Sequence, residues 1–224
     1  MAKKSKTRTS IEEINESLSS FEQKIEKNKK FIYVILGVII VIALIILGYV
    51  NLVRNPAIEN AKQDIALADK EYSEGNDSVA IELYRQVAEK YGNAPANRAS
   101  LNAAIILYQE EKYEEAIECL NDYDPKGAIV GPASQSLLGD CYVNLDNYDA
   151  ALKAYDKAVS LTNDNELYAP IFLMKKASVY RAQQNYAAEA ETYQKISDEY
   201  PEFAVEYNID IEKYLIRAQQ VAGK

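Results

Sequence analysis

The sequence predicts an all-α protein, in which a single transmembrane helix is followed by an α-solenoid of helical hairpins. Three features of the chain indicate this class. Its 224 residues include only eight Gly and six Pro, which favours long helices over many short strands. Residues 31–53 carry no charged side chain. Behind them, a pattern of small, aromatic and aliphatic residues recurs at offsets of 36, 35 and 38 residues.

The composition argues against several functional classes. The net charge of the whole chain is −9. Residues 1–30 carry +3 and Arg54 carries +1, so the net charge of residues 55–224 is −13. Nucleic-acid-binding domains are usually basic, and this body is acidic. The sequence contains no His, the commonest general base and metal ligand. We therefore expect no enzyme activity, no metal, no cofactor and no nucleic-acid partner.

The span is predicted from an unbroken apolar run. Residues 31–50 are apolar apart from the hydroxyls of Tyr33 and Tyr49. Twenty helical residues cross about 30 Å, the thickness of a bilayer's hydrocarbon core, and lipid forces the backbone to satisfy its own hydrogen bonds. A cleaved signal peptide has a shorter apolar region, and a buried core helix is rarely apolar on every face. We expect a transmembrane helix over residues 31–53.

The orientation follows from the flanking cations. Lys24, Lys27, Lys29 and Lys30 precede the apolar run, whereas only Arg54 closely follows it. Positive residues concentrate on the cytoplasmic side of a span. We therefore expect a single-pass protein of the inner membrane with a cytoplasmic N-terminus and an extracytoplasmic, periplasmic body.

The basic head, residues 1–30, contains a second helical pattern. Ser10 and Glu13 form a capping-box pattern that predicts a helix starting at Ser10 and running to residue 30. Apolar residues then recur at steps of three and four: Ile11, Ile14, Leu18, Phe21 and Ile25. This stripe suits either a homodimer through residues 11–25 or an amphipathic helix on the inner leaflet.

The repeated pattern consists of a small residue, a large residue four positions later and another apolar residue three further on. The copies are Ala80, Tyr84 and Val87; Ala116, Leu120 and Tyr123; Ala151, Tyr155 and Ala158; and Tyr193 with Ile196 behind Glu189. Two helices approach closely only where a side chain is small, and the large residue fills the groove beside it. We therefore expect most tyrosines of the body to serve in packing, with their hydroxyls reaching solvent or a partner.

The third copy resembles the tetratricopeptide repeat, a helix–turn–helix of 34 residues. Leu138-Gly139 and Tyr142 match that family's first helix, and Ala151, Tyr155 and Ala158 match its second. The resemblance implies four repeats within residues 58–201, at about 61–94, 97–130, 132–165 and 170–203, and an end-capping helix over 203–221 whose polar outer face includes Arg217. The family's Trp is missing, and Glu189 at the small position suggests a rotated fourth pair.

Two cysteines lie within the repeats. By repeat register, Cys119 and Cys141 are on neighbouring helices. They are either buried core thiols or the two halves of a disulfide, which an extracytoplasmic location permits.

The resemblance also implies a binding surface, because the first helix of each tetratricopeptide repeat lines the concave face. Its groove positions fall on Ile65, Asp69 and Tyr72; Leu101, Ile105 and Tyr108; Ser136, Asp140 and Asn144; and Met174, Ser178 and Arg181. The first two copies offer an apolar and aromatic strip and the last two a polar one. The Lys, Asn and Arg set that clamps acidic peptide C-termini in chaperone-binding members is not assembled.

The layout is similar to that of the membrane-anchored ancillary subunits of the bacterial Sec translocon, and the body to the domain of periplasmic cell-division coordinators. The first hypothesis is an anchored module that binds proteins or peptides of the envelope, including the Sec translocon, and assists translocated or assembling proteins as a chaperone does. The alternative is a static scaffold of an envelope or cell-division complex. An accessory subunit of a cell-wall or sugar enzyme is not separable from that scaffold by sequence.

Overall fold

A computed structural model describes residues 3–163 and 165–223, with side chains from residue 26 onward. The chain divides into two compact units, which meet between Pro56 and Ala57. In the described residues every regular element is a helix, which confirms the predicted all-α class. Each unit is described separately below.

The first unit is one long helix, α1 (Lys3–Tyr49), continued by the short π-helix η1 (Val50–Arg54). Because α1 begins at Lys3, the prediction that Ser10 caps the helix is wrong; helix-favouring Lys and Arg residues extend it toward the N-terminus. The side chains of residues 11–25 lie outside the described ones, so pairing through them stays a prediction.

The apolar part of α1 is exposed along its whole length. Among the described residues, one helix is long and apolar enough to cross a membrane, and its most apolar stretch has no buried residue. The π-helix follows directly and lies just before Pro56. A proline ring cannot donate to the carbonyl four residues earlier and collides with it, so the helix widens there.

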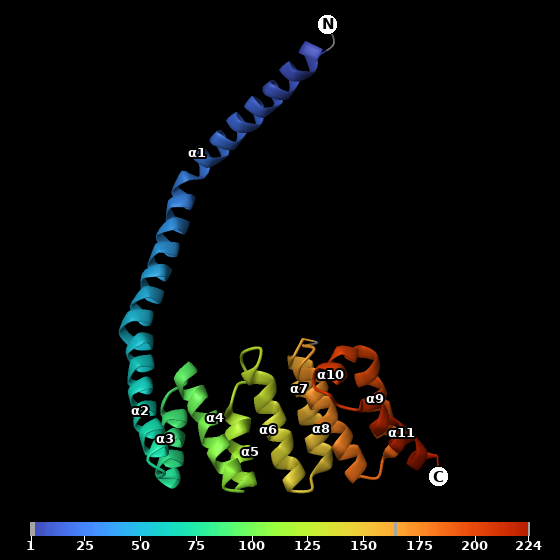
Figure 1. Ribbon diagram of the computed structural model, residues 1–224. Helices are drawn as coiled ribbons and strands as arrows, with labels where there is room; N and C mark the ends of the chain where they lie inside the picture. Colours follow the sequence, from blue (N-terminus) through green and yellow to red (C-terminus); the bar gives the residue numbers. More distant parts are fainter. Residues whose placement is uncertain (1–2, 164, 224) are drawn as a thin grey trace. The chain divides into compact units, whose positions relative to one another are not determined.

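The second unit is a row of antiparallel helix pairs (Figure 1). The pairs are α2 (Asn55–Ser73) with α3 (Asp77–Lys90), α4 (Ala94–Gln109) with α5 (Tyr113–Asp122), α6 (Val130–Asn144) with α7 (Tyr148–Leu161), and α8 (Tyr168–Ala182) with α9 (Tyr186–Glu199). Two more helices follow, α10 (Pro201–Glu206) and α11 (Ile211–Ala222). This arrangement confirms the predicted solenoid.

The turns inside the four pairs share one backbone design. Each contains a residue of positive φ, at Gly75 (82°), Glu111 (59°), Asp146 (55°) and Gln184 (59°). The next N–H donates to a carbonyl five residues back, as from Asn147 to Tyr142 at 2.9 Å. This bond closes the first helix with a Schellman motif, so the same sharp reversal starts each second helix.

The pairs pack through their small residues. Ala80, Ala116 and Ala151 are completely buried. In the third pair, Gly139 of α6 lies very close to α7. A Cβ atom at position 139 would be 2.5 Å from Cε1 of Tyr155. The helices therefore meet where the repeat pattern places its smallest side chains.

Cys119 and Cys141 are both buried and both free thiols. Burial raises the pKa of Cys141 to about 12 and raises that of Cys119 as well. In this structure they have the first of the two predicted roles, that of small core residues.

The prediction of a single capping helix over 203–221 is wrong. Residues 207–210 separate α10 from α11, and Asn208 has a φ of 51°. Phe203 of α10 and Ile211 of α11 are both buried in the core of the last repeats. The side chain of Asp210 then caps α11 by accepting from the N–H of Lys213 at 2.9 Å.

We expect Gly139→Ala to lower the free energy of unfolding, because the new methyl group collides with the ring of Tyr155. Overpacking of this kind costs about 1–3 kcal/mol. Chemical unfolding followed by circular dichroism measures it. Gly92→Ala is the matched control, since a Cβ atom there meets nothing within 4 Å. Equal stability of the two variants would contradict the close approach.

Candidate protein-binding surface

The twelve predicted groove residues all lie on α2, α4, α6 and α8, the first helices of the four pairs. We call the exposed parts of these four helices the first-helix surface. Side-chain contacts join neighbouring members of the row, from α2 to α4 through Tyr72 and Gln109 and from α6 to α8 through Asp140 and Lys175. Side chains thus connect the first helices within each half of the row.

Asp69 is the centre of the polar contacts at the α2 end. One carboxylate oxygen accepts from the hydroxyl of Tyr84 on α3 at 2.5 Å, and the other accepts from Arg98 on α4 at 2.7 Å. Nearby, the hydroxyl of Tyr72 donates to the side chain of Gln109 at 3.3 Å. Asp69 therefore ties its own pair to the next one.

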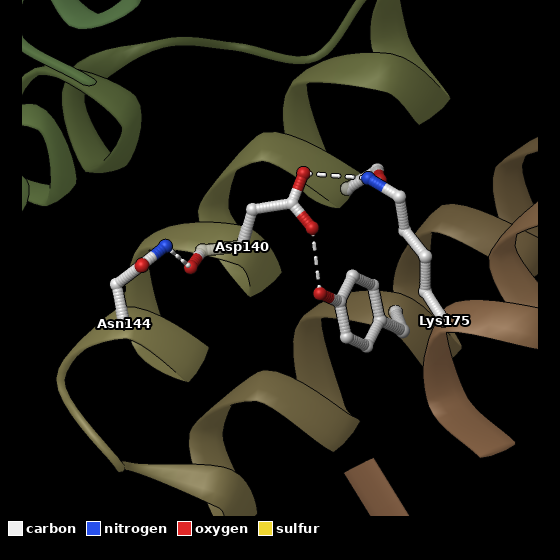
Figure 2. Close-up of polar contacts among 5 residues, drawn as sticks. Asp140, Asn144 and Lys175 are labelled. Carbon is white, nitrogen blue, oxygen red and sulfur yellow. Dashed lines mark hydrogen bonds and ion pairs between the residues drawn. The ribbon is translucent and has the colours of Figure 1, made fainter. Parts of the chain in front are cut away.

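Asp140 has the same role between α6 and α8 (Figure 2). Its carboxylate accepts from the hydroxyl of Tyr155 at 2.7 Å and from Lys175 at 2.5 Å. Lys175 also donates to the hydroxyl of Ser136 at 3.0 Å, and Asn144 donates to the backbone carbonyl of Asp140 at 2.9 Å. Figure 2 shows the carboxylate of Asp140 between the lysine and the tyrosine ring.

The sequence predicts that Tyr84 and Tyr155 pack between helices, but it does not predict that their hydroxyls donate to Asp69 and Asp140. Both Asp–Tyr pairs are separated by 15 residues in the sequence, a recurrence that could have indicated them. Burial, followed by the hydrogen bond to Asp69, raises the pKa of Tyr84 to about 12. Burial and then Asp140 raise the pKa of Tyr155 in the same way. Both hydroxyls thus stay protonated donors.

The apolar strip is less exposed than the sequence predicts. Ile105 is 38% exposed, but Leu101 and Tyr108 are half-buried against the core. Ile65 is only 3% exposed, so its assignment to the groove is wrong. Its side chain packs in the core of the first two pairs, because α3 and α4 cover that face of α2.

The remaining groove positions differ in exposure. Ser136 is buried, and its hydroxyl accepts a hydrogen bond from Lys175 at 3.0 Å. Met174 is half-buried in the core of the last repeats. Ser178 is exposed and donates to the carbonyl of Met174 at 3.1 Å, and Arg181 is exposed. The α8 end therefore offers a cation and a thioether beside the Asp140 contacts.

Charge separates the two sides of the solenoid. The first helices α2, α4, α6 and α8 carry six cations and five carboxylates. The second helices α3, α5, α7 and α9 carry thirteen carboxylates and five cations. Most of the acidity of the body thus lies away from the first helices, which leaves them suited to holding a polypeptide by apolar contacts and hydrogen bonds.

The antiparallel helix pairs, stacked in a row, define a helical-repeat solenoid. Residues 59–181 match the family model of the tetratricopeptide repeat-like domain, and residues 172–202 match a tetratricopeptide repeat. The chain belongs to the tetratricopeptide repeat family. Folds of this family are generally non-catalytic interaction modules.

Solved structures show the same fold. A crystal structure of MamA protein has 20% identity and a TM-score of 0.54, over 74% of this chain and 89% of that one. The repeats of a putative kinesin light chain from Podosopora anserina have 16% identity and a TM-score of 0.53, over 73% and 87%. No curated protein sequence matches the chain. These likenesses concern the fold alone.

We expect the stability of the body to fall between about pH 10 and 12. In the unfolded chain Tyr84 ionises near its ordinary pKa of 10.0, whereas in the folded body it ionises near 12. The stabilisation is therefore complete below pH 10 and is lost as the pH rises through 12. Urea unfolding at pH 8, 10 and 12 measures this decline.

Tyr84→Phe should make the alkaline decline shallower while lowering stability at pH 8, because Asp69 loses a donor. Tyr72→Phe, at an exposed hydroxyl, is the control and should leave the decline unchanged. An identical pH dependence in wild type and Tyr84→Phe would contradict the assignment.

Proposed function

We propose that the protein is a membrane-anchored module that binds segments of other proteins on its first-helix surface. The observation that carries this proposal is the charge difference between the two sides of the solenoid. In a body whose second helices are strongly acidic, α4, α6 and α8 are weakly basic and expose Ile105. Typical protein–protein interfaces combine apolar contacts with about one hydrogen bond per 100–200 Å², and this surface offers both kinds of group.

The anchor is the apolar part of α1, predicted at residues 31–53. Cations gather before it, so we assign the N-terminus to the cytoplasm and the repeats to the extracytoplasmic side of the inner membrane. A binding surface tethered there meets polypeptides as they leave the membrane.

The role that fits this placement is assistance to translocated or assembling envelope proteins, in the manner of a chaperone and with the Sec translocon as a partner. The likeness in layout to the ancillary translocon subunits supports it. Clients of that kind differ in sequence, and Ile105, Leu101 and Met174 offer contacts that do not depend on a particular sequence. Binding of varied clients would therefore use mainly the apolar positions.

A static scaffold of an envelope or cell-division complex is the second candidate, and the polar contacts favour it. Asp69 and Asp140 are each held by two donors from neighbouring helices, so the surface is ordered before any partner binds. Preorganised surfaces suit a constant partner. The number of different partners distinguishes the two roles, because an assisting module binds many clients and a scaffold binds one constant partner.

We expect protease added to spheroplasts to digest the repeats and leave a membrane-embedded fragment that ends near Arg54. This result is expected because cations concentrate on the cytoplasmic side of a span, which assigns the repeats to the opposite side. Immunodetection of tags at the two ends measures it, and inverted vesicles are the control. A body that is protected in spheroplasts and digested in inverted vesicles would reverse the assigned orientation.

We expect a photo-reactive p-benzoylphenylalanine at position 105 to crosslink to partner proteins in cells. The same residue in place of Val79, which is 50% exposed on the second helix α3, is the matched control. Mass spectrometry identifies the products. Crosslinks to many secreted polypeptides and to translocon subunits would support the assisting role. Crosslinks to one stoichiometric partner would support the scaffold. Equal products at both positions would contradict the first-helix surface.

A further inference from the structure

Glu189 on α9 is, among the described side chains, the one charged group that is buried, with a side-chain exposure of 1%. It occupies the position at which the other pairs have Ala80, Ala116 and Ala151. Its Oε1 accepts from Nη2 of Arg217 at 2.6 Å. Its Oε2 is buried and has no hydrogen-bond partner among the described residues. A desolvated carboxylate oxygen without a donor is costly, so this contact is incomplete.

The single donor comes from α11, and not from a neighbouring repeat. Arg217 was expected on the outer face of the cap, but it turns inward while its side chain remains 41% exposed. Its guanidinium lies 5.4 Å from the ring of Tyr214, which stacks on Tyr193 of α9 with ring centroids 5.5 Å apart. One aromatic stack and one half-satisfied ion pair are thus the specific contacts of α11.

A short linker from α10 and packing against α9 hold α11 in place. Residues 207–210 separate it from α10, and Asn208 turns the chain there with a positive φ. The apolar contacts of this 12-residue helix are made by Ile211, Tyr214, Leu215 and Ala218. A helix this short depends on its packing partner, and it would not persist alone in water.

The edge of this contact is acidic. Between α9 and α11 a shallow hollow is lined by Glu191, Asp198 and Glu199, with Lys195 as the cation among them. This edge of α9 therefore attracts a positively charged segment.

We propose that the face of α9 under α11 is a docking site for a cationic amphipathic helix of a partner protein, and that α11 is its intrachain occupant. An arginine placed over Glu189 can donate to both carboxylate oxygens through two parallel hydrogen bonds, which Arg217 does not do. A partner helix that supplies this second hydrogen bond displaces α11. The site is separate from the first-helix surface and does not depend on it.

The test uses the full-length protein in detergent and a defined probe, a fluorescently labelled peptide with the sequence of residues 207–222. In Arg217→Gln the intrachain ion pair is absent, so we expect the peptide to bind about tenfold more tightly than to wild type. Peptide binding should also accelerate hydrogen exchange in the protein's own residues 211–222. A peptide whose arginine is replaced by glutamate is the control and should not bind.

Two variants at Glu189 complete the test. Glu189→Gln keeps the volume of the side chain, and Glu189→Ala restores the residue type of the other three pairs, so folding is preserved in at least one. Each, combined with Arg217→Gln, should weaken peptide binding at least about tenfold, since the carboxylate that holds the arginine is gone. Circular dichroism confirms the fold.

The proposal would be overturned if the peptide bound both Glu189 variants as tightly as Arg217→Gln alone. It would also be overturned if peptide binding left hydrogen exchange in residues 211–222 unchanged. Absence of binding to Arg217→Gln would also overturn it. A dimer of Arg217→Gln chains that the peptide dissociates would assign the site to α11 of a second copy, which excludes a foreign helix as its occupant.

Discussion

The close approach of two helices at a small side chain is the constraint on which the rest of the repeat body depends. Gly139 shows its strictness, because even one added methyl group would lie 2.5 Å from the ring of Tyr155. Ala80, Ala116 and Ala151 meet the same requirement from the second helices. Such pairs cannot bury their apolar faces alone, so each pair is stabilised mainly by its neighbours.

The close approach also determines the polar contacts of the first-helix surface. A large side chain fills the groove beside each small residue, and in the first and third pairs it is a tyrosine. Its hydroxyl then emerges at the first helix, where Asp69 or Asp140 accepts its hydrogen bond and also binds a cation of the next pair. Packing inside a repeat and order on its surface are therefore parts of one arrangement, and a change in either alters the other.

The last pair departs from the constraint, and the end of the solenoid reflects this. Glu189 replaces the small residue, and its carboxylate is buried with one donor, Arg217. A further repeat packed on α9 would have to supply a cation at that point, and α11 does so. The contact between α9 and α11 therefore combines apolar packing with a buried ion pair.

The sequence by itself determined the helical hairpins, the positions of closest approach and the apolar run, since these depend on periodicity and residue size within one segment. The residues of the candidate surface were placed on the correct helices for the same reason. Only the tertiary structure decided that Ile65 is buried, that α10 and α11 are separate and that Arg217 turns toward Glu189. Periodicity shows which side chains share a face of a helix, but the packing of the next helix decides whether that face is covered and which charges meet.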